Sequence, residues 1–334
     1  MPRASIVVPA FNASATIAET LSSLQSQTFR DFEVIVVNDG STDHTVDIIQ
    51  PFLKDSRFHV VNQPNRGLAG ARNTGIAEAA GYYIGFCDSD DLWVADKLAR
   101  HILHLDLSPD VGLSYAGSIL IDGEGQPLGL KQSPRLHAIT AAEVFKRNPV
   151  GNGSVAIFRR AALMDIAYTP QKDRPRQWFF DETFRQSEDI ECWLRLALTT
   201  DWEIEGIRGH LTMYRIAGGG LSANTNKQLA SWNRMVEKLR PLSPIFFAKH
   251  EPAARAYQLR YLARRAVSAG DELKAKKYAR EFLKASFSPL LEEPLKTLTT
   301  LVATACLSRT GYDPMRFAAM LRRGATEPRQ QKQT

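Results

Sequence analysis

The sequence predicts an α/β fold with a mostly parallel, Rossmann-like central sheet, helices on both faces of that sheet, and a helical C-terminal extension. Short β-rich apolar runs alternate with helical patterns through the first hundred residues, which is typical of βαβ units. The runs at residues 6–8 and 34–37 are continuously apolar, as strands buried on both faces of a parallel sheet need to be. From about residue 227 onward the chain is helical and basic.

The predicted elements follow one another closely. We expect strands at residues 5–8, 32–37, 58–61, 82–87 and 111–116, and helices at residues 17–24, 46–53, 69–79 and 193–198. Thr16 and Glu19, three residues apart, are typical of a capping box at the start of the first helix. A Gly-rich segment at residues 151–154 indicates the start of a strand, and residues 257–285 predict a helix pair around the turn at 268–271.

These patterns divide the chain into three regions. Residues 1–225 form the α/β domain, which becomes mixed after residue 110. Residues 226–322 form the helical region. Residues 323–334, rich in Gln, Lys, Arg and Pro, are expected to be a disordered tail.

Composition narrows the class of protein. The 334 residues include 44% hydrophobic residues, enough for a large core. The three cysteines, Cys87, Cys192 and Cys306, show neither disulfide nor zinc spacing.

The sequence shows no secretion signal and no apolar run long enough to span a membrane, so we expect a cytoplasmic protein. The net charge of +6 is spread out, with much of it after residue 230. This favours a solvated basic face or an anionic membrane surface over nucleic acid.

The residues that follow the strands carry the functional information, because ligands of parallel sheets bind outside the carboxyl ends of the strands. These loops are residues 9–12, 38–43, 63–67 and 88–91. Asp88 and Asp90 would present two carboxylates, which suit Mg²⁺ or Mn²⁺ together with a substrate diphosphate. The alternative is that Asp90 or Asp91 caps a helix starting near Trp93.

Two further loops allow a ligand or a structural role. Asp39 could meet a base or ribose edge, or it could belong to a turn in which residues 41–43 cap the next helix. Arg66 and Arg72 flank the turn at residues 67–70, where helix amides and a guanidinium could favour a diphosphate. Residues 9–12 lack the glycines of a dinucleotide-binding loop, which weighs against a dehydrogenase.

Glu188 and Asp189 precede the strongly apolar helix of residues 193–198. Spacing alone favours a role as partners of the helix dipole. A carboxylate facing a sugar acceptor could instead act as a general base.

Together these motifs resemble a known family. The segments at residues 5–12, 37–43, 71–75 and 88–91 are similar in order and spacing to family 2 glycosyltransferases of the bacterial polysaccharide type. The resemblance extends over residues 3–220. It implies an inverting enzyme of the GT-A fold that uses UDP- or related nucleotide-sugars. Residues 1–110 would then bind the nucleotide-sugar, and residues 111–225 the acceptor.

The resemblance also implies site residues. The implied donor site consists of Pro9, Ala10, Phe11, Asp39, Arg72, Asp88, Ser89 and Asp90. Mn²⁺ or Mg²⁺ would bind Asp88 and Asp90, with the main contact from Asp90, and Asp189 would be the catalytic base. The resemblance further implies that four residues bind the acceptor or support the site: Glu188, Asn152, Trp193 and Arg215. Residues 214–222 resemble a Gly/Ser segment that closes over the donor, although Ala217 stands where many relatives carry histidine.

The implied reaction is transfer of a sugar, by a single displacement, to a hydroxyl of a glycan or lipid-linked saccharide in surface polysaccharide synthesis. One alternative is a catalytically silent relative that binds nucleotide-sugar or glycan. The other is a nucleotidyltransferase, whose basic phosphate-binding loop residues 9–12 do not supply. The basic C-terminal residues Arg255, Arg260, Arg264 and 274–277 are compatible with peripheral binding to the inner face of the plasma membrane.

Overall fold

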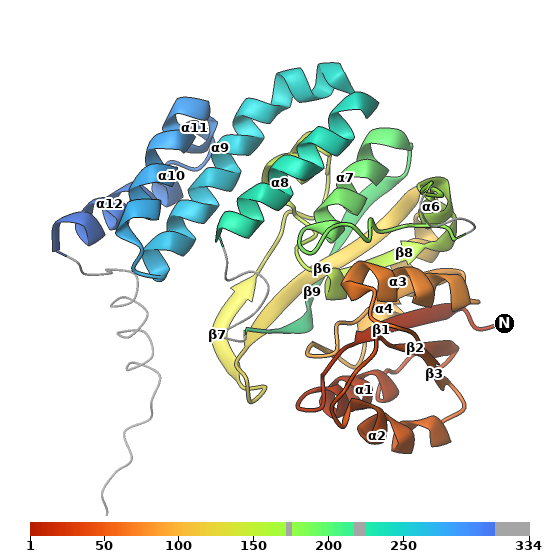
Figure 1. Ribbon diagram of the computed structural model, residues 1–334. Coiled ribbons are helices and arrows are strands. Elements are labelled where there is room, and N and C mark those ends of the chain that lie inside the picture. The colour runs from red at the N-terminus through yellow and green to blue at the C-terminus, as the bar shows by residue number, and fades with distance from the viewer. Residues whose placement is uncertain (172–175, 217–224, 311–334) are drawn as a thin grey trace, which may run out of the picture. The chain divides into compact units, whose positions relative to one another are not determined.

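The computed structural model describes residues 1–171, 176–216 and 225–310 (Figure 1). Within these residues, nine strands form one sheet in the order β3-β2-β1-β4-β8-β6-β9-β5, and β7 pairs with β6. The expected tail at residues 323–334 and the glycine-rich part of the expected donor-closing segment, residues 217–222, lie outside the described residues.

The first half of the sheet is parallel, as predicted. Its strands are β1 (Ala4–Ala10), β2 (Phe32–Asn38), β3 (Phe58–Asn62) and β4 (Tyr83–Phe86). Its helices are α1 (Ile17–Gln25), α2 (Thr45–Ile49) and α3 (Gly67–Glu78). The helix expected over residues 46–53 is shorter than predicted. It continues as a 3₁₀ turn, Gln50–Lys54, because Pro51 has no amide hydrogen for an α-helical bond.

Alternate residues of the strands pack against helices on opposite faces of the sheet. Ile6 and Val34 belong to the core that contains buried residues of α1, α2 and α4 (Lys97–Leu107). Val7 points to the other face, toward α3. A Cβ atom at Gly75 of α3 would lie 2.2 Å from Cγ1 of Val7, so only glycine allows this close packing. The predicted helices on both faces are therefore confirmed (Figure 1).

The second half of the sheet is mixed. It contains β5 (Leu92–Trp93), β6 (Val111–Ile121), β7 (Pro127–Gln132), β8 (Ile157–Arg159) and β9 (Glu203–Arg215), with helices α5 (Ala141–Arg147), α6 (Arg160–Asp165) and α7 (Glu188–Thr199). β8 runs antiparallel to β4 and β6, whereas β6 and β9 are parallel. The segment expected to start a strand at residues 151–154 leads into a 3₁₀ turn, Gly153–Val155, that precedes β8.

Two predictions about helix starts are wrong. The Thr16 side chain does not cap α1; its hydroxyl donates to the Ser89 carbonyl oxygen at 2.8 Å, and Glu19 pairs with Arg215 at 2.6 Å. The helix expected near Trp93 begins at Lys97, because Leu92–Trp93 pairs with β9 instead. In both cases, partners distant in sequence take the groups that local rules assign to a cap.

The described helical region contains α8 (Thr225–Leu239), α9 (Pro244–Ser268), α10 (Glu272–Ala285), α11 (Ser288–Glu292) and α12 (Pro294–Thr310). The predicted helix pair is confirmed as α9 and α10. The chain separates into two compact units. Of the described residues, 1–171, 176–216 and 231–243 form the first, so part of α8 packs with the α/β domain beyond the boundary expected at residue 225. Residues 225–230 and 244–310 form the second.

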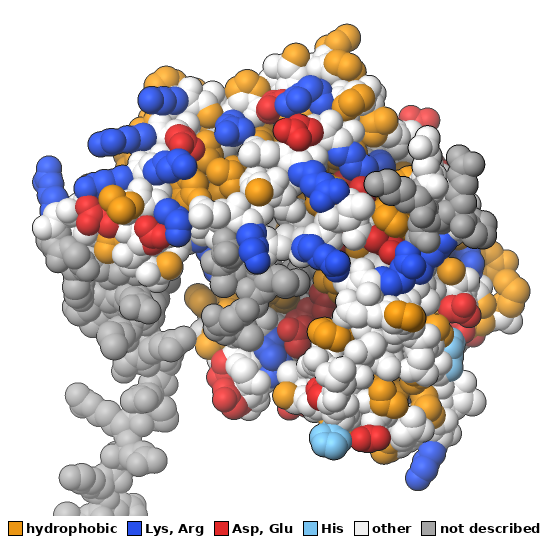
Figure 2. Space-filling model, viewed as in Figure 1, with side chains coloured by type: hydrophobic (Ala, Val, Ile, Leu, Met, Phe, Trp, Pro, Cys, Tyr) orange, Lys and Arg blue, Asp and Glu red, His pale blue; other side chains and the backbone are white. Residues whose placement is uncertain are grey.

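The basic residues of the second unit do not all face solvent. Arg260 is buried and bonds to Glu293 and to the Thr297 hydroxyl, so it does not belong to the basic surface expected from the sequence. Lys and Arg side chains are distributed over the visible face of the molecule, with acidic side chains between them (Figure 2). In the described part of the chain, no helix combines the length and apolarity needed to cross a bilayer.

Candidate active site

The loops after β1 and β2 meet at the carboxyl edge of the sheet and are bonded to each other. The Asn12 amide donates to Oγ of Ser41 at 3.1 Å, and the Thr42 amide donates to Oδ1 of Asn12 at 2.8 Å. Asn12 adopts the left-handed conformation, with φ of 48°. Pro9 and Ala10 are buried, whereas the Phe11 side chain is 50% exposed. This edge therefore presents one aromatic ring beside a rigid pair of loops.

Asp39 is buried at this edge and holds the start of α3. Its carboxylate accepts bonds from the amides of Arg66 and Gly67, both at 2.8 Å, and from Nε2 of Gln63 at 2.6 Å. Asp43, considered as a cap for this turn, accepts the amide of Thr45, the first residue of α2, at 3.0 Å, while His44 at the N-cap position makes no side-chain cap. Asp39 and Asp43 thus bond to the starts of two different helices, α3 and α2.

Arg72 connects the acidic loop after β4 to the start of α7. Its guanidinium is buried and donates to Asp88 at 2.8 Å and to Glu188 at 2.9 Å. The ring of Phe180 lies 5.4 Å from the guanidinium carbon. A Cβ atom at Gly153 would come within 2.2 Å of Nη2, so glycine is required there. Two carboxylates 100 residues apart in sequence are therefore held on one cation.

The acidic loop itself, Asp88 to Asp91, is crowded with like charges. Burial, and then the charge of Asp88, raise the pKa of Asp90 to about 6. Asp91 is fully buried, and burial raises its pKa well above the usual range. Its Oδ1 accepts the Arg215 amide at 2.9 Å. Asp91 therefore caps no helix and instead ties this loop to β9.

Arg215 supports the backbone of the acidic loop. Its Nε donates to the Asp90 carbonyl oxygen at 2.8 Å, and another nitrogen donates to the Gly123 carbonyl oxygen at 2.6 Å. With Glu19 on the same guanidinium, three segments converge on Arg215. The resemblance suggested that Arg215 either binds the acceptor or supports the site. Its bonds to the backbone of the acidic loop fit the supporting role.

Ser154 and Lys97 are supporting residues that sequence reasoning missed. The Asp88 amide donates to Oγ of Ser154 at 2.9 Å, and Nζ of Lys97 donates to the Ser154 carbonyl oxygen at 2.6 Å. Lys97 is fully buried, which lowers its pKa to about 7. No motif marks either residue, because their partners come from another part of the chain.

Asp189 lies in the first turn of α7, partly buried. Ser187, just before the helix, has a left-handed φ of 64° and makes no side-chain cap. The carboxylate of Asp189 accepts the amide of Ile190 at 2.7 Å. Burial, and then the charge of Glu188, raise the pKa of Asp189 to about 7, while Arg72 opposes this rise. Near neutral pH this carboxyl group can therefore both accept and release a proton.

Two other residues suggested by the resemblance occupy different surroundings. Among the described residues, both amide atoms of Asn152 are shielded from solvent and have no hydrogen-bond partner. A buried amide without partners destabilises the fold unless a ligand or water bonds to it.

Trp193 is fully buried, and its ring lies 5.9 Å from that of Phe180. Trp193 can thus support Arg72 through Phe180, but it does not reach the surface.

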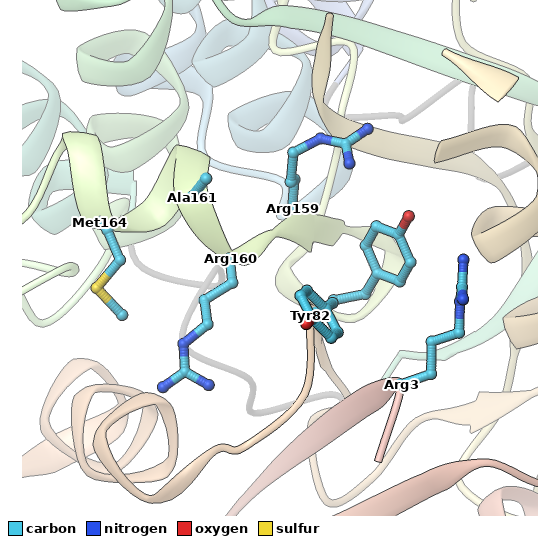
Figure 3. A pocket seen from close by; sticks show the side chains of 7 residues that line it. Arg3, Tyr82, Arg159, Arg160, Ala161 and Met164 are labelled. Carbon is cyan, nitrogen blue, oxygen red and sulfur yellow. The ribbon is translucent and has the colours of Figure 1, made fainter. Parts of the chain in front are cut away.

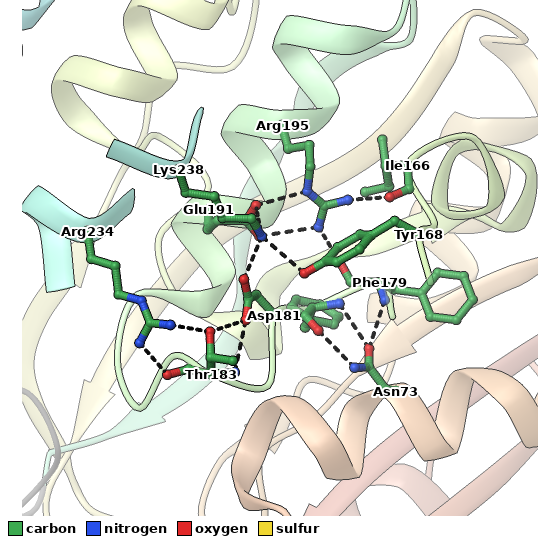
Figure 4. A network of polar contacts seen from close by, with 11 residues as sticks. Asn73, Ile166, Tyr168, Phe179, Asp181, Thr183, Glu191, Arg195, Arg234 and Lys238 are labelled. Carbon is green, nitrogen blue, oxygen red and sulfur yellow. Dashed lines mark hydrogen bonds and ion pairs between the residues drawn. The ribbon is translucent and has the colours of Figure 1, made fainter. Parts of the chain in front are cut away.

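A polar network holds the segment that carries Phe180 (Figure 4). The Asn73 side chain donates to the Phe180 carbonyl oxygen at 2.8 Å and accepts the Phe180 amide at 2.9 Å. Lys238 of α8 donates to Asp181 at 2.7 Å and pairs with Glu191 of α7 at 2.9 Å. This network therefore links α3, α7 and α8 to the segment of Phe180, whose ring contacts Arg72.

A pocket at the opposite edge of the sheet is a separate feature (Figure 3). Its lining includes Arg3 and Tyr82, which immediately precede β1 and β4. Arg159 and Arg160, also in the lining, donate to backbone carbonyl oxygens of Leu105 and Ala79. These arginines bond to the C-terminal ends of α4 and α3, and this pocket is not the candidate active site.

Comparison with known proteins decides the family. The model described as Glycosyl transferase family 2 matches residues 5–167. TuaG of Bacillus subtilis (strain 168), named for teichuronic acid biosynthesis, is 32% identical over 225 residues, which are 67% of this chain and 82% of TuaG. The chain belongs to glycosyltransferase family 2. The family match includes Arg72 and the acidic loop but ends before Asp189.

Two further proteins resemble this glycosyltransferase. WfaP of Escherichia coli, a UDP-Glc:alpha-D-GlcNAc-diphosphoundecaprenol beta-1,3-glucosyltransferase, is 32% identical over 72% of this chain and 87% of WfaP. The crystal structure of S. aureus TarS 1-349 in complex with UDP has a TM-score of 0.58 at 19% identity, covering 93% of this chain and 92% of that one. The GT-A fold inferred from the sequence is thereby confirmed. The chain is a glycosyltransferase related to enzymes of bacterial polysaccharide synthesis.

Proposed function

We propose that this glycosyltransferase moves a sugar, with inversion, from a UDP-sugar to a hydroxyl group of a lipid-linked saccharide, with Asp189 as the base. The observation that carries the proposal is the arrangement around Arg72, which holds Asp88 on one side and the Glu188–Asp189 pair on the other. The proposed donor-binding loop and the proposed base thus adjoin residues that share one guanidinium, which supports the proposal. WfaP, whose name specifies UDP-Glc and a diphosphoundecaprenol-linked acceptor, supports the substrate classes.

The nucleoside of the donor would lie at the β1 and β2 loops. The exposed ring of Phe11 offers a stacking surface, and Pro9 and Ala10 form the strand end beneath it. Asp39 has four lone-pair sites, of which three are used by the α3 loop. The remaining site, or the loop that Asp39 holds, would meet the edge of the base. TarS crystallised with UDP and with UDP-GlcNAc supports a uridine nucleotide.

The acidic loop fits a divalent cation. Asp88 and Asp90 offer carboxylate oxygens, the ligands that Mg²⁺ and Mn²⁺ prefer. Burial and the charge of Asp88 raise the pKa of Asp90, and the charge of Arg215 offsets this rise only in part. Among the described residues, no group of three or more acidic, His or Cys side chains could hold a metal alone. The diphosphate of the donor would complete the set. A cation bound there would offset the charge of the leaving nucleotide.

The remaining chemistry belongs to the residues of the chain. Asp189 would take the proton of the acceptor hydroxyl as the oxygen attacks the anomeric carbon from the side opposite the nucleotide. This single displacement inverts the configuration. Arg72 would keep the carboxylates in place and stabilise their charge. The unsatisfied amide of Asn152 would bond to a sugar hydroxyl.

Activity should depend on the protonation of Asp189. Because the active form is the carboxylate and its pKa is about 7, we expect kcat/KM to rise with pH up to about 7 and to level off above it. Glu188→Gln removes the neighbouring negative charge, so the rising limb should move to lower pH. A profile that is flat from pH 5 to pH 8, with UDP binding unchanged over that range, would exclude a catalytic base with the raised pKa of Asp189.

The donor class can be tested by thermal shift. We expect UDP-sugars with Mn²⁺ to raise the melting temperature more than GDP- or dTDP-sugars do, because a tight ligand stabilises the folded state by mass action. The best donor is then incubated with a diphosphoundecaprenol-linked saccharide, and free UDP and elongated acceptor are measured. Stronger stabilisation by a GDP- or dTDP-sugar would refute the uridine assignment.

The two alternatives drawn from the sequence are not favoured. The named relatives are glycosyltransferases rather than nucleotidyltransferases. A silent relative would not need the base, yet Arg72 joins Asp88 to Glu188, the neighbour of Asp189. Since the proposed acceptor is a lipid, we further propose that the protein works in the cytoplasm at the inner face of the plasma membrane.

A further inference from the structure

The outward face of α12 is apolar, whereas its inward face is rich in threonine. Leu295, Leu298 and Val302 are 80%, 49% and 59% exposed. Their spacing of three and four residues places them on one side of the helix, and we call them the α12 stripe. The threonines at positions 297, 300 and 304 are buried on the other side. A helix at the surface of a globular protein normally has the reverse pattern.

The helix is held firmly in this orientation. The hydroxyls of Thr300 and Thr304 donate to the carbonyl oxygens four residues earlier, both at 2.8 Å. These bonds satisfy the hydroxyls, so burying them costs little. Ala303 and Leu307 pack in the core formed with α9 and α10. The α12 stripe therefore remains outside because the opposite side is fully occupied.

Two further apolar residues just before α12, Phe287 and Leu291, are also exposed. Several exposed apolar residues on one helix face, as in the α12 stripe, mark an interaction site. The α12 stripe thus needs a partner with an apolar interior.

Charge identifies the kind of partner. Residues 294–310 contain Lys296 and Arg309 but no Asp or Glu. Residues 244–310 contain twelve Lys and Arg against six Asp and Glu. A second copy would bring the same positive unit against this one, which is unfavourable. Residues 311–334, with five basic and two acidic residues, carry the same sign. An anionic partner fits better.

We propose that α12 lies flat in the surface of an anionic lipid bilayer, with the α12 stripe in the acyl boundary and the exposed Lys296 and Arg309 of the same helix at the headgroups. Interfacial helices combine these two contacts. The helix has 17 residues and is not of the kind that spans a bilayer. The proposal rests on the proposed function in one respect: a lipid-linked acceptor is held in such a surface.

Co-sedimentation of the full chain with vesicles tests this surface. The vesicles contain either phosphatidylcholine alone or phosphatidylcholine with phosphatidylglycerol. We expect binding to the anionic vesicles at low salt. Leu298→Gln combined with Val302→Gln should lower the partition coefficient at least about tenfold. The reason is that burying each of these two apolar side chains in the acyl boundary adds to the free energy of binding. The matched control, Leu298→Met with Val302→Leu, keeps the apolar surface and should bind within about twofold of the original chain.

Several outcomes would overturn the proposal. They are no binding of the original chain to anionic vesicles, equal binding by the Gln pair, and self-association that the Gln pair abolishes without any vesicle binding. Circular dichroism melting shows whether the Gln pair folds. If it does not, Leu295→Gln at the most exposed stripe position replaces it, with an expected loss of at least about threefold.

Vesicle binding needs neither donor nor acceptor, so its result is independent of catalysis. In parallel, UDP titration without vesicles should give the same affinity for the Gln pair and the original chain. Failure of UDP binding in both proteins would refute the proposed function and leave the membrane surface standing. Failure of vesicle binding with normal UDP affinity would refute the membrane surface alone.

Discussion

Asp189→Asn should lower sugar transfer by about 10³-fold while leaving UDP affinity within a few-fold of the original value. The amide has nearly the same shape as the carboxylate but cannot accept the proton of the acceptor hydroxyl at neutral pH. Asp189 makes no bond to Arg72, so the Arg72 contacts with Asp88 and Glu188 should persist. Elongated acceptor and released UDP are measured at saturating donor and acceptor, and UDP affinity is measured by calorimetry.

Asp47→Asn is the matched control, because the Asp47 side chain is largely exposed on α2. It should leave both transfer and UDP affinity unchanged. The assignment of Asp189 fails if its Asn variant retains transfer comparable to that of the control. A parallel loss of UDP affinity and of melting temperature would show that the substitution damages the fold instead of the chemistry.

Asp90→Ala should remove the part of UDP affinity that depends on Mn²⁺. In the original chain we expect Mn²⁺ to tighten UDP binding by at least about tenfold, because the cation joins the acidic loop to the diphosphate. Without the Asp90 carboxylate, affinities with and without Mn²⁺ should become similar. Calorimetric titration of UDP under both conditions measures the difference directly.

Asp47→Asn is again the matched control, because its largely exposed side chain on α2 is not one of the proposed donor-site residues. This variant should retain the Mn²⁺ effect. UDP binding by the original chain that is indifferent to Mn²⁺ would refute the metal site, as would an undiminished Mn²⁺ effect in Asp90→Ala.

The candidate donor residues in the first ninety positions could be predicted from local sequence patterns. Continuous apolar runs predict buried parallel strands, and the residues after such strands must lie at one edge of the sheet. Asp39, Asp88 and Asp90 could therefore be placed together before any contact was known. For Asp189, spacing alone favoured a helix-dipole role, and its catalytic role followed from the family resemblance.

Contacts between distant segments could not be read in this way. Thr16 and Glu19 match a local cap, yet the side chains bond to Ser89 and Arg215. Gly153 and Ser154 gain their roles from Arg72 and Asp88. Sequence spacing carries no information about such partners, because a side chain's bonds depend on which groups the fold brings near it.

The sequence by itself determined the order of strands and helices over the first hundred residues and the family of the enzyme, since these depend on periodicity and on short motifs. Only the tertiary structure decided that Arg72 joins Asp88 to Glu188, that burial and Glu188 raise the pKa of Asp189, and which side of α12 faces outward. Charge interactions and burial depend on three-dimensional neighbours. In α12, leucine and threonine recur with the same helical period, so periodicity alone cannot tell which face packs inward.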